Sequence, residues 1–168
     1  MVLLAAPPLA SPPAIVPESV PVLDSVDALM TLVAKQPRGP VVVHFWATWC
    51  RACVAEMPKI RKLQAAAAAR GLPMIGVSMD PSEKAPEVAE FARREGLTFQ
   101  NVILSAPDPE PVVRRFDPRW RAELPATFLA LQSGVIVDSF LGSTPVKKIE
   151  GQLDQLLDPP AKAQAPRP

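Results

Sequence analysis

The chain has 168 residues, and its 18 Lys and Arg residues nearly balance its 17 Asp and Glu residues, which gives a formal net charge of +1. This balance excludes a nucleic-acid binder that relies on bulk positive charge. The length suits one domain, and the 48% of hydrophobic residues is enough for a buried core. No apolar run reaches the roughly 18 residues that a transmembrane helix requires.

Proline is concentrated at the two ends of the chain. Of the 22 prolines, ten lie in residues 1–21 and 159–168. Pro/Ala-rich stretches of this kind predict extended segments, so we expect a flexible leader over 1–18, one globular domain over 19–158 and a disordered tail over 159–168. The apolar start, Met1–Ala6, lacks a positive region and is too short for a signal peptide or an anchor. We expect either the remnant of a signal or a longer natural N-terminus.

Strands and helices alternate along the central part of the chain, which ends in a hairpin and a helix. The nearly continuous apolar run Val41–Trp46 is typical of a strand that is buried on both faces. Gln132–Gly134 indicates a hairpin turn between two strands. The expected strands are 20–23, 41–46, 74–79, 100–104, 127–131 and 135–141, and the expected helices are 26–36, 50–69, 86–95, 110–116 and 145–157. This order predicts an α/β fold with a mixed sheet.

The only two cysteines, Cys50 and Cys53, lie three residues apart, where the central strand has ended and a helix begins. The free backbone N–H groups and the dipole at a helix start stabilise a thiolate, so we expect Cys50 to be an accessible attacking thiol. Cys53 lies one turn further along and is sheltered, which suits the thiol that resolves a mixed disulfide. The positive charge of Arg51 is expected to lower the pKa of Cys50 further.

The run FWATWCRAC at residues 45–53 resembles the motif of the thioredoxin superfamily, and in particular of the membrane-tethered thiol–disulfide oxidoreductases of the TlpA/ResA kind. The resemblance also rests on Glu56–Pro58, on Leu124–Phe128 and on Gly134, and it spans about residues 40–142. It implies a thioredoxin-like fold, with a central mixed β-sheet flanked by helices. It also implies a protein-disulfide oxidoreductase that exchanges its cysteine pair with protein substrates through a mixed disulfide, without a metal or an organic cofactor.

Two further features of the sequence carry expectations of their own, the first in keeping with the TlpA-like pattern and the second a departure from it. Cys53 and Pro125 are 72 positions apart, which is more than in thioredoxin itself. This distance suits a TlpA-like insertion of a helix and a strand, here about 86–104, between the CxxC helix and the proline strand. The family often has Pro before the second cysteine, where this chain has Ala52. We therefore predict that the Cys50–Cys53 pair is less reducing than thioredoxin, whose reduction potential is about −270 mV.

The resemblance also assigns residues around the disulfide. Pro125 is expected to follow a cis peptide bond and to face the disulfide, so that the backbone of Leu124 is exposed to a substrate strand. The alternative is an ordinary trans proline that begins a strand. The residues expected to contact the substrate are Trp49, Arg51, Ala52 and Leu124. For Trp49, core packing alone is the alternative.

Two titratable residues are expected to move protons near the cysteine pair. Glu56 follows Cys53 by three residues on the same side of the helix and resembles the family's buried acid. With a raised pKa it would exchange a proton with Cys53, and the alternative is an exposed helix-surface glutamate. The only histidine, His44, matches the position of a buried Asp in thioredoxin. We expect a neutral imidazole with a pKa nearer neutrality, and a hydrogen-bonded core histidine is the alternative.

The alternatives to dithiol exchange are a redox-inactive thioredoxin-fold binding module and a peroxidase-like variant. Zinc needs four ligands, whereas the chain offers only Cys50, Cys53 and His44, so no metal site is expected.

The resemblance also has implications for where and with which partners the protein acts. It implies a periplasmic or other extracytoplasmic monomer, tethered through a missing or partial N-terminus. A cytoplasmic reductase is the alternative. The implied partners are protein thiols and disulfides together with a redox partner protein, in redox homeostasis or cytochrome c biogenesis. No nucleic acid is expected among them.

Overall fold

The structure, a computed structural model, describes residues 19–37, 39–105, 108 and 110–158 of the chain. The leader predicted over 1–18 and the tail predicted over 159–168 lie outside the described residues. Within the described part, no helix has both the length and the apolar character that a membrane crossing would take.

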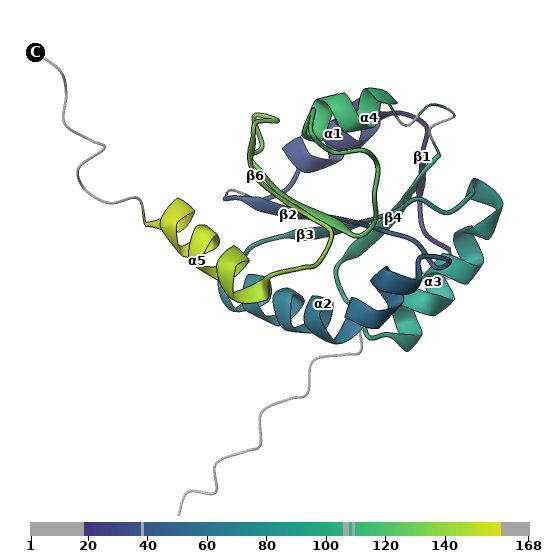
Figure 1. Cartoon of the computed structure of the whole chain (residues 1–168), viewed down its shortest axis with the longest axis horizontal. Coiled ribbons are helices and arrows are strands. Elements are labelled where there is room, and N and C mark those ends of the chain that lie inside the picture. Colours follow the sequence, from purple (N-terminus) through teal and green to yellow (C-terminus); the bar gives the residue numbers. More distant parts are fainter. Residues whose placement is uncertain (1–18, 38, 106–107, 109, 159–168) are drawn as a thin grey trace, which may run out of the picture.

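The strands form one mixed sheet in the order β1-β4-β3-β2-β5-β6. They are β1 (Val22–Leu23), β2 (Val41–Trp46), β3 (Met74–Ser78), β4 (Gln100–Leu104), β5 (Ala126–Ala130) and β6 (Ile136–Leu141). β2 pairs in parallel with β3 and antiparallel with β5 (Figure 1). Every residue of β2 is buried, which confirms the central strand expected from its apolar run.

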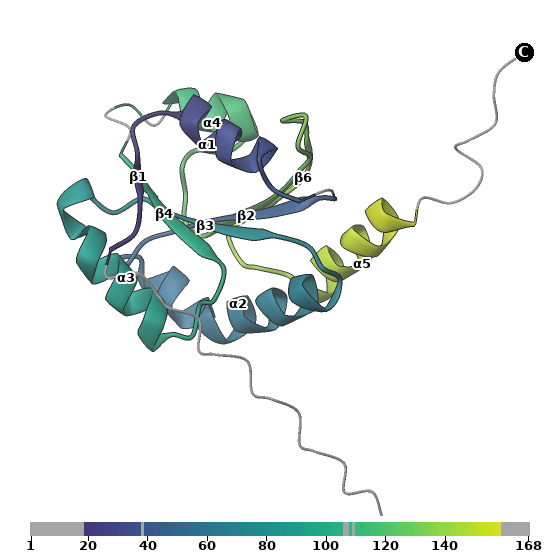
Figure 2. The same ribbon diagram turned by 180° about the vertical axis from the view of Figure 1, so that it is seen from behind.

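Helices cover both faces of this sheet. They are α1 (Val26–Ala34), α2 (Arg51–Ala69), α3 (Ala85–Arg94), α4 (Glu110–Phe116) and α5 (Val146–Leu157), and a short 3-10 turn (Ser82–Lys84) precedes α3. α1 and α4 lie on one face, whereas α2, α3 and α5 lie on the other (Figures 1 and 2). The expected mixed sheet flanked by helices is confirmed, and the observed bounds differ from the expected ones by at most two residues.

The segment 86–104, expected to be an insertion, holds most of α3 and all of β4. β4 lies between β1 and β3 and pairs in parallel with both strands. The segment therefore adds a strand inside the sheet rather than at its edge. That it is an insertion relative to thioredoxin stays a prediction.

Aromatic side chains form the centre of the core on the α1 and α4 face. The ring centroid of Phe45 lies 4.9 Å from that of Phe116, 4.8 Å from that of Trp120 and 5.6 Å from that of Phe128. The indole N–H of Trp120 donates a hydrogen bond to the carbonyl oxygen of Glu123 at 2.8 Å, so its polar group is satisfied. This packing fixes the chain that leads from α4 to β5.

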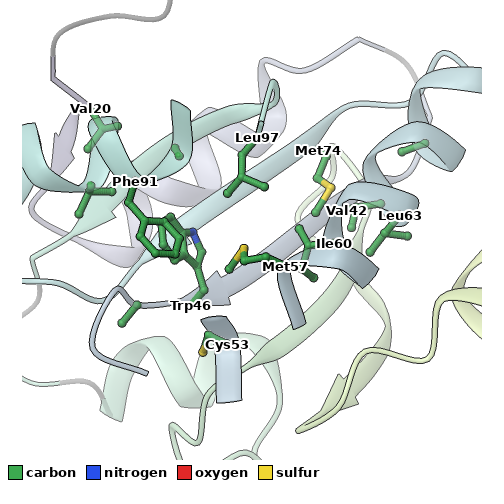
Figure 3. Close-up of a cluster of buried hydrophobic side chains, with 14 of the residues drawn as sticks. Val20, Val42, Trp46, Cys53, Met57, Ile60, Leu63, Met74, Phe91 and Leu97 are labelled. Atoms are coloured by element: carbon green, nitrogen blue, oxygen red, sulfur yellow. The ribbon is translucent and has the colours of Figure 1, made fainter. Parts of the chain in front are cut away.

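The second cysteine belongs to the core on the opposite face. Figure 3 shows Cys53, Met57 and Ile60 of α2 beside Trp46 of β2, and all four side chains are buried. Trp46 also packs against Phe91 of α3, with ring centroids 5.2 Å apart. Because successive strand residues point to opposite faces, Trp46 packs in this core, whereas its neighbour Phe45 packs in the core on the α1 and α4 face. The apolar side of α2 thus holds the start of the helix, and with it the cysteine pair, against the sheet.

Candidate active site

Cys50 and Cys53 form a disulfide at the N-terminus of α2, with their Cα atoms 5.2 Å apart. Cys50 is the N-cap residue of the helix, and its Sγ accepts a hydrogen bond from the backbone N of Cys53 at 3.1 Å. The Sγ atom therefore lies at the positive end of the helix dipole, beside first-turn N–H groups. This environment favours negative charge on the Cys50 sulfur once the disulfide is reduced.

The two cysteines differ in exposure, but by less than the sequence suggested. Cys50 is 7% exposed and Cys53 is fully buried. Cys53 is sheltered as expected, whereas the expectation of an accessible Cys50 is met only by a small exposed edge. The reason is that the Cys50 side chain folds back over the first turn of α2 toward Cys53. The residues next to Cys50 in the sequence are exposed, since Trp49 is 64% exposed and Arg51 and Ala52 are exposed as well.

A cis peptide bond joins Leu124 to Pro125, which confirms the expected isomer. β5 begins at the next residue, and its register with β2 pairs Ala126 with Phe45. Pro125 therefore lies at the end of the sheet at which β2 stops and the cysteine loop begins. Gly142, which follows β6, donates its backbone N–H to the carbonyl oxygen of Pro125 at 2.9 Å. Leu124 is half-buried, and its contact with a substrate stays a prediction.

Glu56 is buried on α2, with 8% of its surface exposed, so the exposed alternative is wrong. Its carboxylate accepts hydrogen bonds from the backbone N of Thr144 at 2.9 and 3.2 Å and from Lys59 Nζ at 2.9 Å. Burial raises the pKa of Glu56, but the hydrogen bonds from Lys59 and Thr144 outweigh burial and hold the pKa below its ordinary value. The expected raised pKa is therefore wrong, because these donors stabilise the charged form.

His44 is buried in β2, with 1% of its surface exposed. Its Nδ1 lies 2.9 Å from the hydroxyl oxygen of Thr127, the residue opposite it on β5. Burial lowers the pKa of His44 from 6.5 to about 4, and the negative charge of Glu56 opposes this shift only in part. The imidazole is neutral at pH 7 as expected, but the expected pKa near neutrality is wrong. Among the described residues, Nε2 has no hydrogen-bond partner.

Asp80 is a site residue that the sequence analysis did not single out. It follows β3 and is buried, with its Oδ2 accepting from the backbone N of Thr48 at 2.9 Å and its Oδ1 accepting from the Thr48 hydroxyl at 2.5 Å. The Ser78 hydroxyl donates to the same carboxylate at 2.6 Å. The signal that could have found Asp80 is topological, because parallel strands such as β2 and β3 end at the same edge of a sheet.

Comparison with known proteins agrees with this geometry. A family model described as Redoxin matches residues 16–157. The chain belongs to the Redoxin family. It is 33% identical over 115 residues to the thioredoxin-like protein YneN of Bacillus subtilis (strain 168), an alignment that covers 68% of this chain and 63% of YneN. It is 30% identical over 122 residues to the thiol-disulfide oxidoreductase ResA of Geobacillus kaustophilus (strain HTA426), covering 69% of this chain and 62% of that protein.

These matches confirm the resemblance to the TlpA/ResA kind, although the chain spans less than two thirds of the length of these two relatives. The fold of this Redoxin family member is also similar to that of solved structures. The crystal structure of StoA from Bacillus subtilis has a TM-score of 0.51 at 20% identity, with 70% of this chain and 84% of StoA covered. A thiol:disulfide interchange protein of the thioredoxin family from Chlorobium tepidum TLS has a TM-score of 0.54 at 20% identity, with 83% and 97% covered. The thioredoxin-like fold is confirmed.

Proposed function

We propose that this protein is a thiol–disulfide oxidoreductase that exchanges its cysteine pair with the cysteines of other proteins. The observation that carries the proposal is a disulfide at a helix N-terminus, with Cys50 at the surface edge, Cys53 beneath it and cis-Pro125 at the same edge of the sheet. The ResA relatives, whose names are those of thiol-disulfide oxidoreductases, support the same activity.

In the oxidising direction, a substrate thiolate attacks Sγ of Cys50 and the Cys50–Cys53 bond breaks. Cys53 leaves as a thiolate and takes up a proton, while Cys50 is joined to the substrate in a mixed disulfide. A second substrate thiolate then attacks the substrate sulfur and releases the Cys50 thiolate, so the substrate loses two electrons and the protein gains them. The reducing direction runs these steps backwards, with Cys50 as the nucleophile and Cys53 as the resolving thiol.

Two residues are proposed to accept the proton of the Cys53 thiol. Glu56 lies one turn along α2 from Cys53 and is held as a carboxylate, which makes it an acceptor. His44 is neutral near pH 7, so one of its ring nitrogens is also able to accept a proton. Both belong to elements that adjoin the disulfide, since β2 leads into the cysteine loop and α2 begins with the pair.

The surface around the disulfide is proposed to hold an extended segment of the substrate. Trp49, Arg51 and Ala52, which flank Cys50 along the chain, are exposed. The backbone of Leu124, next to cis-Pro125, would pair with the substrate strand, as in other cases of strand addition to a sheet. These contacts would position the substrate cysteine over the exposed edge of Cys50.

We propose an extracytoplasmic, membrane-tethered setting for this exchange, with a separate redox partner protein and no bound cofactor. Its support is the resemblance of the CxxC motif and the proline strand to membrane-tethered oxidoreductases. A role in cytochrome c biogenesis or in redox homeostasis belongs to the same proposal. An oxidising compartment also suits a protein whose function depends on forming and passing on disulfides.

The experiment that tests the proposal is insulin reduction together with trapping of the mixed disulfide. The wild-type protein is expected to catalyse the reduction, and Cys53→Ser is expected to accumulate a mixed disulfide that Cys50→Ser does not form. Equal trapping by both variants would contradict the assigned roles. Failure of the wild-type protein to exchange with any protein disulfide would favour the redox-inactive binding module instead.

A further inference from the structure

A groove between α2 and the start of α5 concentrates positive charge close to the disulfide. Its volume is about 720 Å³. Its charged lining residues are Lys59, Lys62, Lys147, Lys148 and Glu150, and the buried Thr144 also lines it. We call this feature the basic groove. Figures 1 and 2 show that α2 and α5 lie side by side on the same face of the sheet. The lysines that line the groove come from these two helices.

Acidic neighbours balance only part of this charge, since the four lysines face one lining carboxylate, Glu150, besides the Glu56 that pairs with Lys59. Lys59 pairs with Glu56, whereas Lys62, Lys147 and Lys148 form no ion pair within the part of the chain that the structure describes. α5 has 12 residues, with no acidic residue in its first turn and no side-chain cap, so its positive end adds to the field. The net charge of the whole chain is only +1, so the excess at the groove is local.

Thr144 links the basic groove to the site around the disulfide. It is only 2% exposed, and its backbone N donates to the Glu56 carboxylate at 2.9 Å. The Thr144 hydroxyl oxygen is buried as well, so the charged donors that the groove presents to a ligand are the ammonium groups of its lysines.

Two hydrogen bonds connect the lining of the basic groove to the surroundings of cis-Pro125 and the disulfide. Gly142 donates to the carbonyl oxygen of Pro125 at 2.9 Å, and Thr144 follows Gly142 by two residues. Glu56, one turn beyond Cys53, ties Thr144 to α2 at 2.9 Å. An extended chain advances about 3.3–3.6 Å per residue. A segment that reacts at Cys50 and passes Pro125 therefore reaches the groove within a few residues.

We propose that the basic groove binds Asp and Glu side chains of the protein partner, located a few residues from the cysteine that reacts with Cys50. This inference rests on the proposed thiol–disulfide exchange and specifies its partners. The occupant is a polypeptide because the groove adjoins the strand edge at which the partner's cysteine must lie. Charge complementarity selects acidic segments over neutral ones and raises their rate of encounter.

The test uses two peptides that each carry one cysteine in a mixed disulfide with a neutral reporter thiol. One peptide has three Asp residues after the cysteine, and the other has Asn at the same positions. At low ionic strength the reduced protein is expected to react about tenfold faster with the acidic peptide, and added salt is expected to reduce this ratio. In the double variant Lys62→Gln and Lys147→Gln the ratio should fall toward one. The matched control, Lys35→Gln with Lys84→Gln, removes two exposed lysines elsewhere and should keep it.

A second arm separates this proposal from the proposed function. Peptides with Ser in place of Cys are titrated into the oxidised protein, and binding is measured by calorimetry. Absence of any exchange, with neutral hydroxyethyl disulfide as well as with both peptides, would overturn the proposed function. Equal exchange rates and equal binding of the two peptides would overturn the basic groove alone. Lysine-dependent binding of only inorganic phosphate, or only of vesicles containing anionic lipid, would also overturn it.

Discussion

Asp80 binds both the backbone N–H and the hydroxyl of one residue, Thr48, two positions before Cys50. The clamp joins the end of β3 to the loop that follows β2. The cysteine loop is thus held by a neighbouring strand of the sheet as well as by its own helix. The carboxylate is buried and also accepts from Ser78, so removing it leaves several donors without their acceptor.

Asp80→Ala is therefore expected to lower the free energy of unfolding by about 1–3 kcal/mol, because buried donors lose their partner. Disulfide exchange should also slow, since the loop before Cys50 loses its anchor. Urea unfolding of the oxidised protein and the rate of insulin reduction check these outcomes. As a matched pair, Thr48→Ser keeps the hydroxyl and should stay near wild type, whereas Thr48→Val should not. An Asp80→Ala variant as stable and as fast as wild type would refute the clamp.

The lowered pKa of Glu56 predicts how stability depends on pH. Because the folded pKa lies below the ordinary value, the contribution of the carboxylate is present above the ordinary pKa and is lost as pH falls through the folded pKa. The stability difference between wild type and Glu56→Gln should therefore be larger at about pH 7 than at about pH 3. Urea unfolding of both oxidised proteins measures it. A difference that does not change with pH would show that the carboxylate's charge is not stabilised by Lys59 and Thr144.

His44 is expected to titrate at about pH 4 rather than near 6.5, because burial disfavours the imidazolium. As the chain has a single histidine, one imidazole signal in a proton NMR titration reports this pKa directly. Over the window from about 6.5 down to about 4 the unfolded state binds the proton first, so stability should fall by roughly 3 kcal/mol. A midpoint between about 6 and 7 would contradict the buried neutral state.

A further variant separates the packing of His44 from a role in proton transfer. His44→Ala removes both the ring and its contact with Thr127. If His44 carries the proton of Cys53, the pH profile of the exchange rate should change shape, not only its height. An unchanged profile would leave His44 the packing role alone.

The residue before the second cysteine, Ala52, is expected to influence the reduction potential of the Cys50–Cys53 pair. The wild-type pair should be less reducing than thioredoxin, whose reduction potential is about −270 mV. Ala52 lies in the first turn of α2, where proline is tolerated. Ala52→Pro should therefore shift the couple toward thioredoxin, while Ala52→Ser serves as the control without the ring. Equilibration with glutathione buffers measures all three, and a wild-type couple below thioredoxin would contradict the expectation.

The sequence by itself determined the order of elements and the position of the cysteine pair. Val41–Trp46 is apolar except for His44, which favours a buried strand, and Cys50 follows this run where a helix begins. These patterns are local, since periodicity and helix capping depend on residues a few positions apart. The isomer of Pro125 came from the resemblance of the surrounding motif, and the structure agrees.

Only the tertiary structure decided the charge states and the anchors of the site. Glu56 has a lowered pKa because Lys59, on the next turn of α2, and Thr144, 88 residues away, both donate hydrogen bonds to its carboxylate, and only the fold brings Thr144 to α2. His44 has a lowered pKa because the helices and strands around β2 remove it from water. Asp80 meets Thr48 because β2 and β3 run in parallel and end at one edge. Ionisation depends on burial and on donors brought from distant segments, and no short pattern encodes these.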